Sequence, residues 1–144
     1  MSARHGKLAC VLFYDGKLME YHQSRLGIRS VANARKCMQR WLELYSPSVV
    51  IAEDFRTAKS KGKKQREIIK EIKKTARLHG VKTVSIRRRT EFGKTFKRND
   101  SLAKRFPRVA HLNPKRPKLW EAEPKEMSLF EALSIAVSAK ADRV

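Results

Sequence analysis

The stretch Ser48-Val49-Val50-Ile51-Ala52-Glu53-Asp54 decides the fold of this chain. Its apolar part is a continuous, β-branched run, which is typical of a strand covered on both faces. Two carboxylates end that run, although the whole chain has only 14 Asp and Glu. Carboxylates cost least in water, so a buried strand that delivers two of them indicates a functional site. In α/β sheets ligands bind beyond the carboxyl ends of strands, where these acids are expected.

The segments on either side of this run predict alternating helix and strand. Upstream, apolar residues recur at helical spacing from Val31 to Tyr45, with Ser30 suited to the N-cap and Pro47 closing the helix. Downstream, an amphipathic helix is expected from Lys63 to His79, packed on the sheet with its basic side outward. A second apolar strand, Val81–Ile86, follows. Strand, helix and strand in this order favour parallel pairing.

The ends of the chain add a hairpin and a buried helix. Asp15-Gly16 suits the two-residue loop of a hairpin between two apolar strands, Leu8–Tyr14 and Lys17–Gln23. The segment Met127–Lys140 is apolar nearly all round, as in a buried helix. Short helices are expected at Thr90–Phe96 and at Asp100–Phe106, the second capped by Asn99. Together the segments predict a single α/β domain, residues 1–144, with a mixed sheet and flanking helices.

The composition indicates a polyanionic partner. The chain has 34 Lys and Arg against 14 Asp and Glu, a formal net charge of +20. Such a surface binds phosphate backbones by releasing counterions, so nucleic acid is the expected partner, DNA before RNA. No stretch approaches the ~20 apolar residues that span a bilayer, so no membrane role is expected. Cys10 and Cys37 lie in separate apolar segments, which favours reduced thiols of a cytoplasmic protein.

Several segments in fixed order carry a family resemblance. They are the hairpin Leu8–Gln23, the helix ending in Trp41-Leu42-Glu43-Leu44-Tyr45-Ser46-Pro47, the strand Val49-Val50-Ile51-Ala52-Glu53, the basic helix, Val81–Ile86 with the downstream Thr90-Glu91-Phe92-Gly93-Lys94, and Phe130-Glu131-Ala132-Leu133-Ser134-Ile135-Ala136. This ordered set resembles the RuvC-like branch of the ribonuclease H-like nucleases. The segment Lys118-Leu119-Trp120-Glu121-Ala122-Glu123 is similar to one found before the last helix in uncharacterised bacterial RuvC-like proteins.

The resemblance implies a ribonuclease H-like fold and metal-dependent phosphodiester hydrolysis. Carboxylates of the family hold two Mg²⁺ or Mn²⁺ ions roughly 4 Å apart. By motif match, Glu53 and Glu131 take the places of two metal ligands, with Asp54 beside Glu53. Lys94 matches a lysine that positions the scissile phosphate, and Ser128 stands where another acid is expected. The resemblance also implies a homodimer.

Phosphate contacts are expected from basic residues around this site. They are Lys61, Lys63, Lys64, Arg87, Arg88, Arg89 and Lys94. Each candidate has a structural alternative. Glu53 and Asp54 could face solvent at a strand end, Glu131 could pair with a Lys or Arg under the sheet, and Arg87–Arg89 could be a solvated charge cluster.

The N-terminus departs from the family pattern. Family members begin with a strand that ends in a catalytic aspartate, whereas Met1–Gly6 contains no apolar run and no acid. The first strand is therefore expected to be missing, and either the gene product starts upstream of Met1 or the sheet is rearranged. Asp15 is better explained as a turn residue than as a substitute. Two functions stay open: a metal-dependent endonuclease, with activity impaired by the missing aspartate, and a non-catalytic DNA- or RNA-binding protein that keeps the fold.

Overall fold

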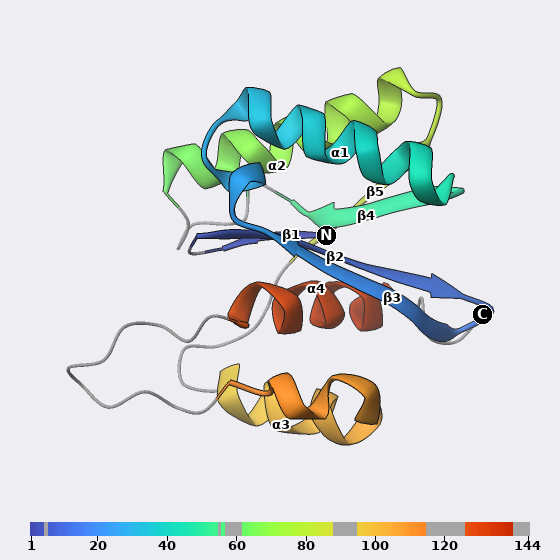
Figure 1. The fold of residues 1–144 in the computed structure, drawn as a ribbon, viewed down its shortest axis with the longest axis vertical. Helices are drawn as coiled ribbons and strands as arrows, with labels where there is room; N and C mark the ends of the chain where they lie inside the picture. Colours follow the sequence, from blue (N-terminus) through green and yellow to red (C-terminus); the bar gives the residue numbers. More distant parts are fainter. Residues whose placement is uncertain (5, 55, 57–61, 88–94, 115–125, 140–144) are drawn as a thin grey trace.

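A computed structural model describes the chain except residues 5, 55, 57–61, 88–94, 115–125 and 140–144. The strands are β1 (Ser2–Arg4), β2 (Lys7–Tyr14), β3 (Lys17–Ser24), β4 (Val49–Glu53) and β5 (Lys82–Ile86). The helices are α1 (Val31–Tyr45), α2 (Lys63–Leu78), α3 (Thr95–Arg105) and α4 (Met127–Ser138), with short 3₁₀ turns η1 (Leu26–Ile28) and η2 (Pro107–Leu112) (Figure 1). The expected α/β class with mixed strand directions and flanking helices is confirmed.

The hairpin and the parallel pair form as expected. In the turn between β2 and β3, Asp15 and Gly16 have φ of 49° and 76°, the left-handed values that this tight loop requires. β4 and β5 pair in parallel, with Val49 opposite Lys82 and Glu53 opposite Ile86. The carboxyl ends of both strands therefore meet at one edge, and α2 connects them.

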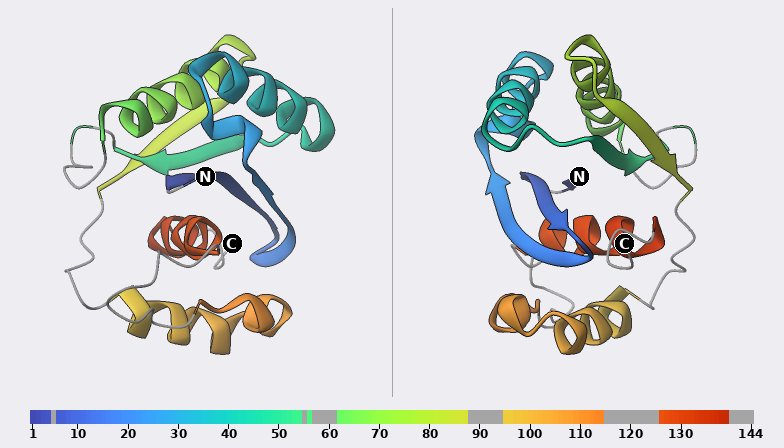
Figure 2. Two further views of the ribbon diagram at one scale, coloured as in Figure 1. Left: turned by 60° about the vertical axis from the view of Figure 1, so that its left-hand side comes forward. Right: turned by 90° about the vertical axis from the view of Figure 1, so that its right-hand side faces the viewer.

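A short first strand is present, so the expectation that it is missing is wrong. Ser2–Arg4 pairs antiparallel with Lys7–Ala9 at the start of β2, with Ser2 opposite Ala9. On its other side the Met1 nitrogen donates a hydrogen bond of 2.7 Å to the Ile51 carbonyl of β4. β1 thus lies between the hairpin and β4, and the two do not pair directly (Figure 2). The strand ends in Arg4 and carries no aspartate.

An apolar groove continues the line of β1. It has a volume of about 420 Å³, and its walls include Cys10–Tyr14 of β2, Val49–Ile51 of β4 and Met1. Within the described residues, no strand pairs with this length of β2 on the side of β1. The groove is therefore a gap between two strand edges, floored by apolar side chains.

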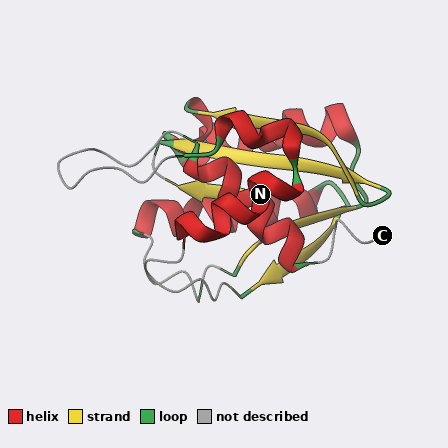
Figure 3. Cartoon of the chain, turned by 90° about the horizontal axis from the view of Figure 1, so that it is seen from below, coloured by secondary structure: helices red, strands yellow, loops and turns green. Residues whose placement is uncertain are grey.

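Helices cover both sides of the strands and create two apolar cores. α1 and α2 lie on one side, where the buried residues include Leu8, Met38 and Ile72. α4 lies on the other side, and α3 packs beyond it, with Phe130 and Leu133 of α4 in the second core (Figure 2). Figure 3 gives the view from below, with helices and strands distinguished by colour. Burial against both the strands and α3 explains why α4 is apolar nearly all round.

The middle of the chain differs from expectation at one helix. α3 begins at Thr95 rather than near Asp100, and Asn99 is not its cap. Asn99 is fully buried inside the helix, where its Nδ2 donates to the Met127 sulfur at 3.6 Å. Most of the expected Thr90–Phe96 helix lies outside the described residues. No helix in the described part of the chain is long and apolar enough to cross a bilayer.

Candidate functional site

Glu131 of α4 is bound to the first strand. Its side chain is fully buried, and it accepts hydrogen bonds from Ser2 Oγ at 2.7 Å and from the Arg4 guanidinium at 3.0 Å. The second contact is an ion pair in which Arg4 is mostly covered. Ser128, one turn earlier, donates to the Arg4 and Lys7 carbonyls. The alternative of a basic partner under the sheet is therefore confirmed for Glu131, and the partner is Arg4.

Glu53 and Asp54 lie at the carboxyl edge of β4. Val50 of this strand packs in the core beneath α1 and α2, so alternation directs Glu53 to the opposite side, the side of α4. Glu53 is buried, with 2% of its surface exposed. Glu131 bonds to Ser2 and Arg4 of β1, and Ile51, two residues before Glu53, bonds to Met1. The alternative that Glu53 faces solvent is wrong.

Asp54 has a partner of its own. The Arg56 side chain donates to both carboxylate oxygens at 3.2 Å, and the Arg56 backbone N–H donates at 3.0 Å. These bonds lower the pKa of Asp54 below its usual range. Asp54 is therefore a carboxylate at neutral pH, held by a protein cation.

Lys73 is a further charged residue at this edge, and the sequence pattern did not single it out. It comes from the buried side of α2, and its ammonium donates to Ser85 Oγ of β5 at 2.7 Å. Burial lowers the pKa of Lys73, and the negative charge of Asp54 offsets part of that effect. A lysine in the middle of a basic helix gives no sequence signal of this kind, because its burial depends on where the helix packs.

The described acids do not fit a two-metal site. Both oxygens of Glu131 and both oxygens of Asp54 already accept hydrogen bonds from protein donors, two of them arginine side chains. Among the residues that the structure describes, no three His, Cys, Asp or Glu side chains form a group that could hold a metal ion. Arg4 and Arg56 already place a positive charge beside these two carboxylates, so a divalent cation would compete with them. Mg²⁺ or Mn²⁺ binding thus remains a prediction from the resemblance.

The basic residues of α2 form one exposed line. Lys63, Arg66, Lys70, Lys74 and Arg77 recur at spacings of three and four, all are exposed, and we call them the basic stripe. The opposite side of the helix is buried and apolar. The expected division of this helix into a packed side and a basic side is confirmed.

Other predicted phosphate contacts lie at the start of this helix and beyond β5. Lys63 and Lys64 occupy the first turn of α2, and Arg87 follows directly after β5; all three are exposed. Because β4 and β5 are parallel and Glu53 pairs with Ile86, Arg87 lies at the carboxyl edge beside Glu53 and Asp54. Four predicted contacts, Lys61, Arg88, Arg89 and Lys94, lie outside the described residues.

The sequence reasoning missed a pocket on the far side of α1. It lies between the end of β3, η1 and α1, and includes His22, Lys36, Arg40 and Trp41. The spacing of Lys36 and Arg40 on one helix face could have indicated it, but the strand that completes the pocket is distant in sequence. Comparison with protein-family models, with curated proteins and with solved structures gave no match.

Proposed function

We propose that this protein binds nucleic acid through the outer surface of the α1–α2 layer, without needing a metal ion. The observation that carries the proposal is the basic stripe of α2. A line of exposed cations on a rigid helix presents charge to a phosphate backbone in a fixed arrangement, whereas scattered surface lysines do not. Arg35 of α1 pairs with Glu71 of α2 at 2.7 Å, which ties the two helices of this surface together.

The dimensions of the stripe suit a duplex. Lys63 and Arg77 are separated by 14 residue steps, which at about 1.5 Å per residue is roughly 21 Å. This corresponds to the rise of about six base pairs. The sequence offers no preference for particular bases, so backbone contact is the expected mode and DNA is the first ligand to test, before RNA.

Of what the resemblance to RuvC-like proteins implies, the fold is part of this proposal and hydrolysis is not. A ribonuclease H-like architecture is supported by the element order, with the hairpin, the parallel pair joined by a helix, and the final helix beneath the strands. Hydrolysis receives less support, since Arg4 engages Glu131, one of the two expected metal ligands, and Arg56 engages Asp54 beside the other. Binding is therefore favoured over cleavage.

The test compares two double variants of equal charge. Lys70→Gln with Lys74→Gln removes two cations from the basic stripe, and Lys97→Gln with Lys104→Gln removes two exposed cations from α3 on the far side of α4. Fluorescence anisotropy with a labelled DNA duplex, repeated over a range of salt, measures affinity and the number of counterions released. Circular dichroism melting checks that both variants are folded.

We expect the stripe variant to bind DNA more weakly. Its slope of log K against log salt should be shallower by about two, since each phosphate contact contributes about 0.9 to that slope. The α3 variant should keep the slope of the unmodified protein. Equal losses in the two variants would show that net charge alone drives binding, and an unchanged stripe variant would exclude the stripe as the interface.

A further inference from the structure

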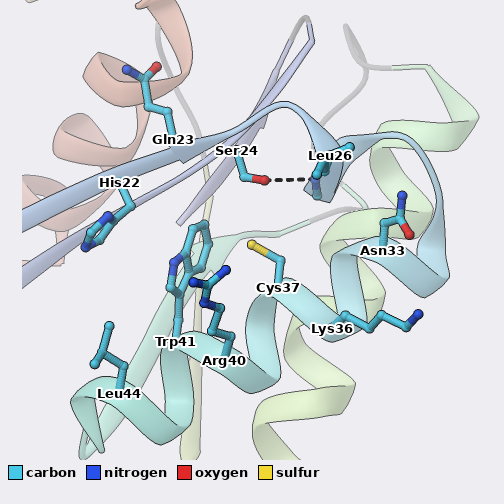
Figure 4. Close-up of a pocket in the computed structure, with 11 residues that line it drawn as sticks. His22, Gln23, Ser24, Leu26, Asn33, Lys36, Cys37, Arg40, Trp41 and Leu44 are labelled. Atoms are coloured by element: carbon cyan, nitrogen blue, oxygen red, sulfur yellow. Dashed lines mark hydrogen bonds between the residues drawn. The ribbon is translucent and has the colours of Figure 1, made fainter.

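The pocket beside α1 combines aromatic and cationic walls. Its volume is about 540 Å³, within the range of small-ligand sites. Trp41, Arg40, Lys36 and Cys37 come from one side of α1, while His22 comes from β3 (Figure 4). Gly27 of η1 forms part of the wall, and its backbone N–H donates to Ser24 Oγ at 3.0 Å. None of the described residues that line the pocket is acidic.

The aromatic wall is held in place by its neighbours. His22 is stacked with Trp41 at a ring-centroid distance of 6.3 Å and an interplanar angle of 29°. The His22 ring also contacts the Tyr45 ring, with centroids 5.6 Å apart, and the Tyr45 hydroxyl is hydrogen-bonded to His22 Nε2. Trp41 is half-buried and packs against the core beneath α1, so one part of the indole is fixed while another part borders the pocket.

The cationic wall of the pocket spans about one turn of α1, next to Trp41. Lys36 and Arg40 are four residues apart, so their side chains occupy one side of α1. Both are exposed and both line the pocket. Figure 4 shows the Arg40 guanidinium beside Trp41 and the Lys36 ammonium farther toward the start of α1, so the pocket offers a phosphate group two separate cations. An aromatic ring recognises the flat face of a base.

We propose that this pocket binds one unpaired nucleotide, with the base against Trp41 and the phosphate at Lys36 and Arg40. The inference rests on the proposed nucleic-acid binding and names its substrate class: a nucleic acid that has an unpaired nucleotide next to a duplex. Asn33, in the first turn of α1, adds an amide group to the pocket lining, whereas the Gln23 side chain points to the opposite side of β3 from His22 and Ser24 (Figure 4).

The first experiment uses the fluorescence of Trp41. The chain has two tryptophans, so Trp120→Phe leaves Trp41 as the only one. Thymidine 5′-monophosphate is titrated into this variant, with thymidine alone and inorganic phosphate as comparison ligands. We expect saturable quenching by the nucleotide. Half-maximal quenching by thymidine alone should require a concentration about tenfold higher, because thymidine lacks the charge-assisted contacts to the two cations. Lys36→Gln with Arg40→Gln should abolish that difference.

Cys37 gives a second readout that does not depend on stacking. It lines the pocket, and burial raises its thiol pKa, so alkylation by iodoacetamide at about pH 8.5 should be slow but measurable. Cys10 is buried outside this pocket, and burial raises its pKa to about 12, so it serves as the unreactive internal control. Thymidine 5′-monophosphate should slow Cys37 alkylation without changing Cys10.

Two DNA ligands test whether the pocket takes a free nucleotide or an unpaired nucleotide within a strand. A duplex with a short single-stranded tail should bind the unmodified protein about tenfold more tightly than the blunt duplex, equivalent to about 1.4 kcal/mol. The variant Lys36→Gln with Arg40→Gln should bind both duplexes equally. If the free nucleotide binds and the tail brings no gain, the pocket serves free nucleotides and the proposed substrate is wrong.

The outcomes distinguish this inference from the proposed function. Absence of both quenching and Cys37 protection, with duplex binding by the basic stripe intact, overturns the pocket alone. Nucleotide binding in the pocket, with no difference between the stripe variant and its α3 control, overturns the stripe alone.

Discussion

At the scale of single residues, Arg4 and Glu131 join the beginning of the chain to its last helix. Glu131 is fully buried and Arg4 is only 23% exposed, so both charges have lost most of their water. A buried pair of this kind adds little stability over an apolar pair, but loss of one partner leaves an uncompensated charge in the interior. The importance of the pair therefore lies in the stability that would be lost if one partner were removed.

Substitution of Arg4 tests this directly. Arg4→Met should lower the free energy of unfolding by about 3 kcal/mol, because buried Glu131 loses the guanidinium that pairs with its carboxylate. The double variant Arg4→Met with Glu131→Leu should be more stable than Arg4→Met alone, since it removes the orphaned charge. Urea unfolding of the two single variants and the double variant measures the coupling. An Arg4→Met protein as stable as the unmodified one would show that the pair is not electrostatically important.

At the scale of elements, α1 carries both the pocket and one wall of the first core, so its N-terminus must be fixed. The Ser30 side chain accepts a hydrogen bond from the Asn33 backbone N–H at 3.1 Å, as the sequence predicted for an N-cap. The cap satisfies one of the donors that an α-helix leaves open at its start.

Removal of this cap should be measurable. Ser30→Ala should lower the free energy of unfolding by about 1 kcal/mol, as cap deletions generally do. Ser30→Asp keeps an acceptor at the same position and should retain most of the stability, which makes it the matched control. Thermal or urea unfolding checks both, and equal losses in the two variants would mean that the serine acts through something other than its cap.

The elements with strong local patterns were predictable, and those made by distant contacts were not. The hairpin, α1, β4 and α4 follow from turn chemistry, helical spacing and apolar runs within single segments. β1 has no apolar pattern in Ser2-Ala3-Arg4 and forms because β2 and β4 provide partners. Asn99 was predicted to be a helix cap because asparagine is common at helix ends. The sequence does not show the core contacts that bury it inside α3.

The candidate site also has features that the sequence predicts and features that depend on distant contacts. The basic side of α2 could be predicted from its own spacing. The engagement of Glu131 by Arg4 joins positions 127 residues apart, and the burial of Lys73 depends on how α2 lies over β5. The pocket likewise needs β3 and α1 together. Sequence patterns identify which residues are charged, whereas packing decides which charges are already paired.

At the scale of the whole molecule, the net charge of +20 is shared between cations that act inside the fold and cations that face outward. Arg4 is mostly covered and pairs with Glu131, and Arg35 pairs with Glu71 while half of its side chain stays exposed. The basic stripe, Lys36 and Arg40 face outward. Affinity for DNA should therefore depend on the outward cations and on salt, and not on added metal.

A chelator separates the two functions that the sequence left open. EDTA should leave the affinity for duplex DNA unchanged, and added Mg²⁺ or Mn²⁺ should produce no cleavage of linear or branched DNA above the protein-free control. The reason is that protein donors already occupy both Glu131 and Asp54. Cleavage that requires Mn²⁺ and disappears in Glu53→Gln, with binding retained, would establish the nuclease instead.

The groove between β2 and β4 has a practical consequence for handling the protein. The Met1 nitrogen already bonds to Ile51, so any residues fused ahead of Met1 are directed along the two facing strand edges. A purification handle at that end would then add an extra strand or wedge the edges apart. Stability should therefore be measured both with and without residues ahead of Met1, and a difference would report how the two strand edges respond to them.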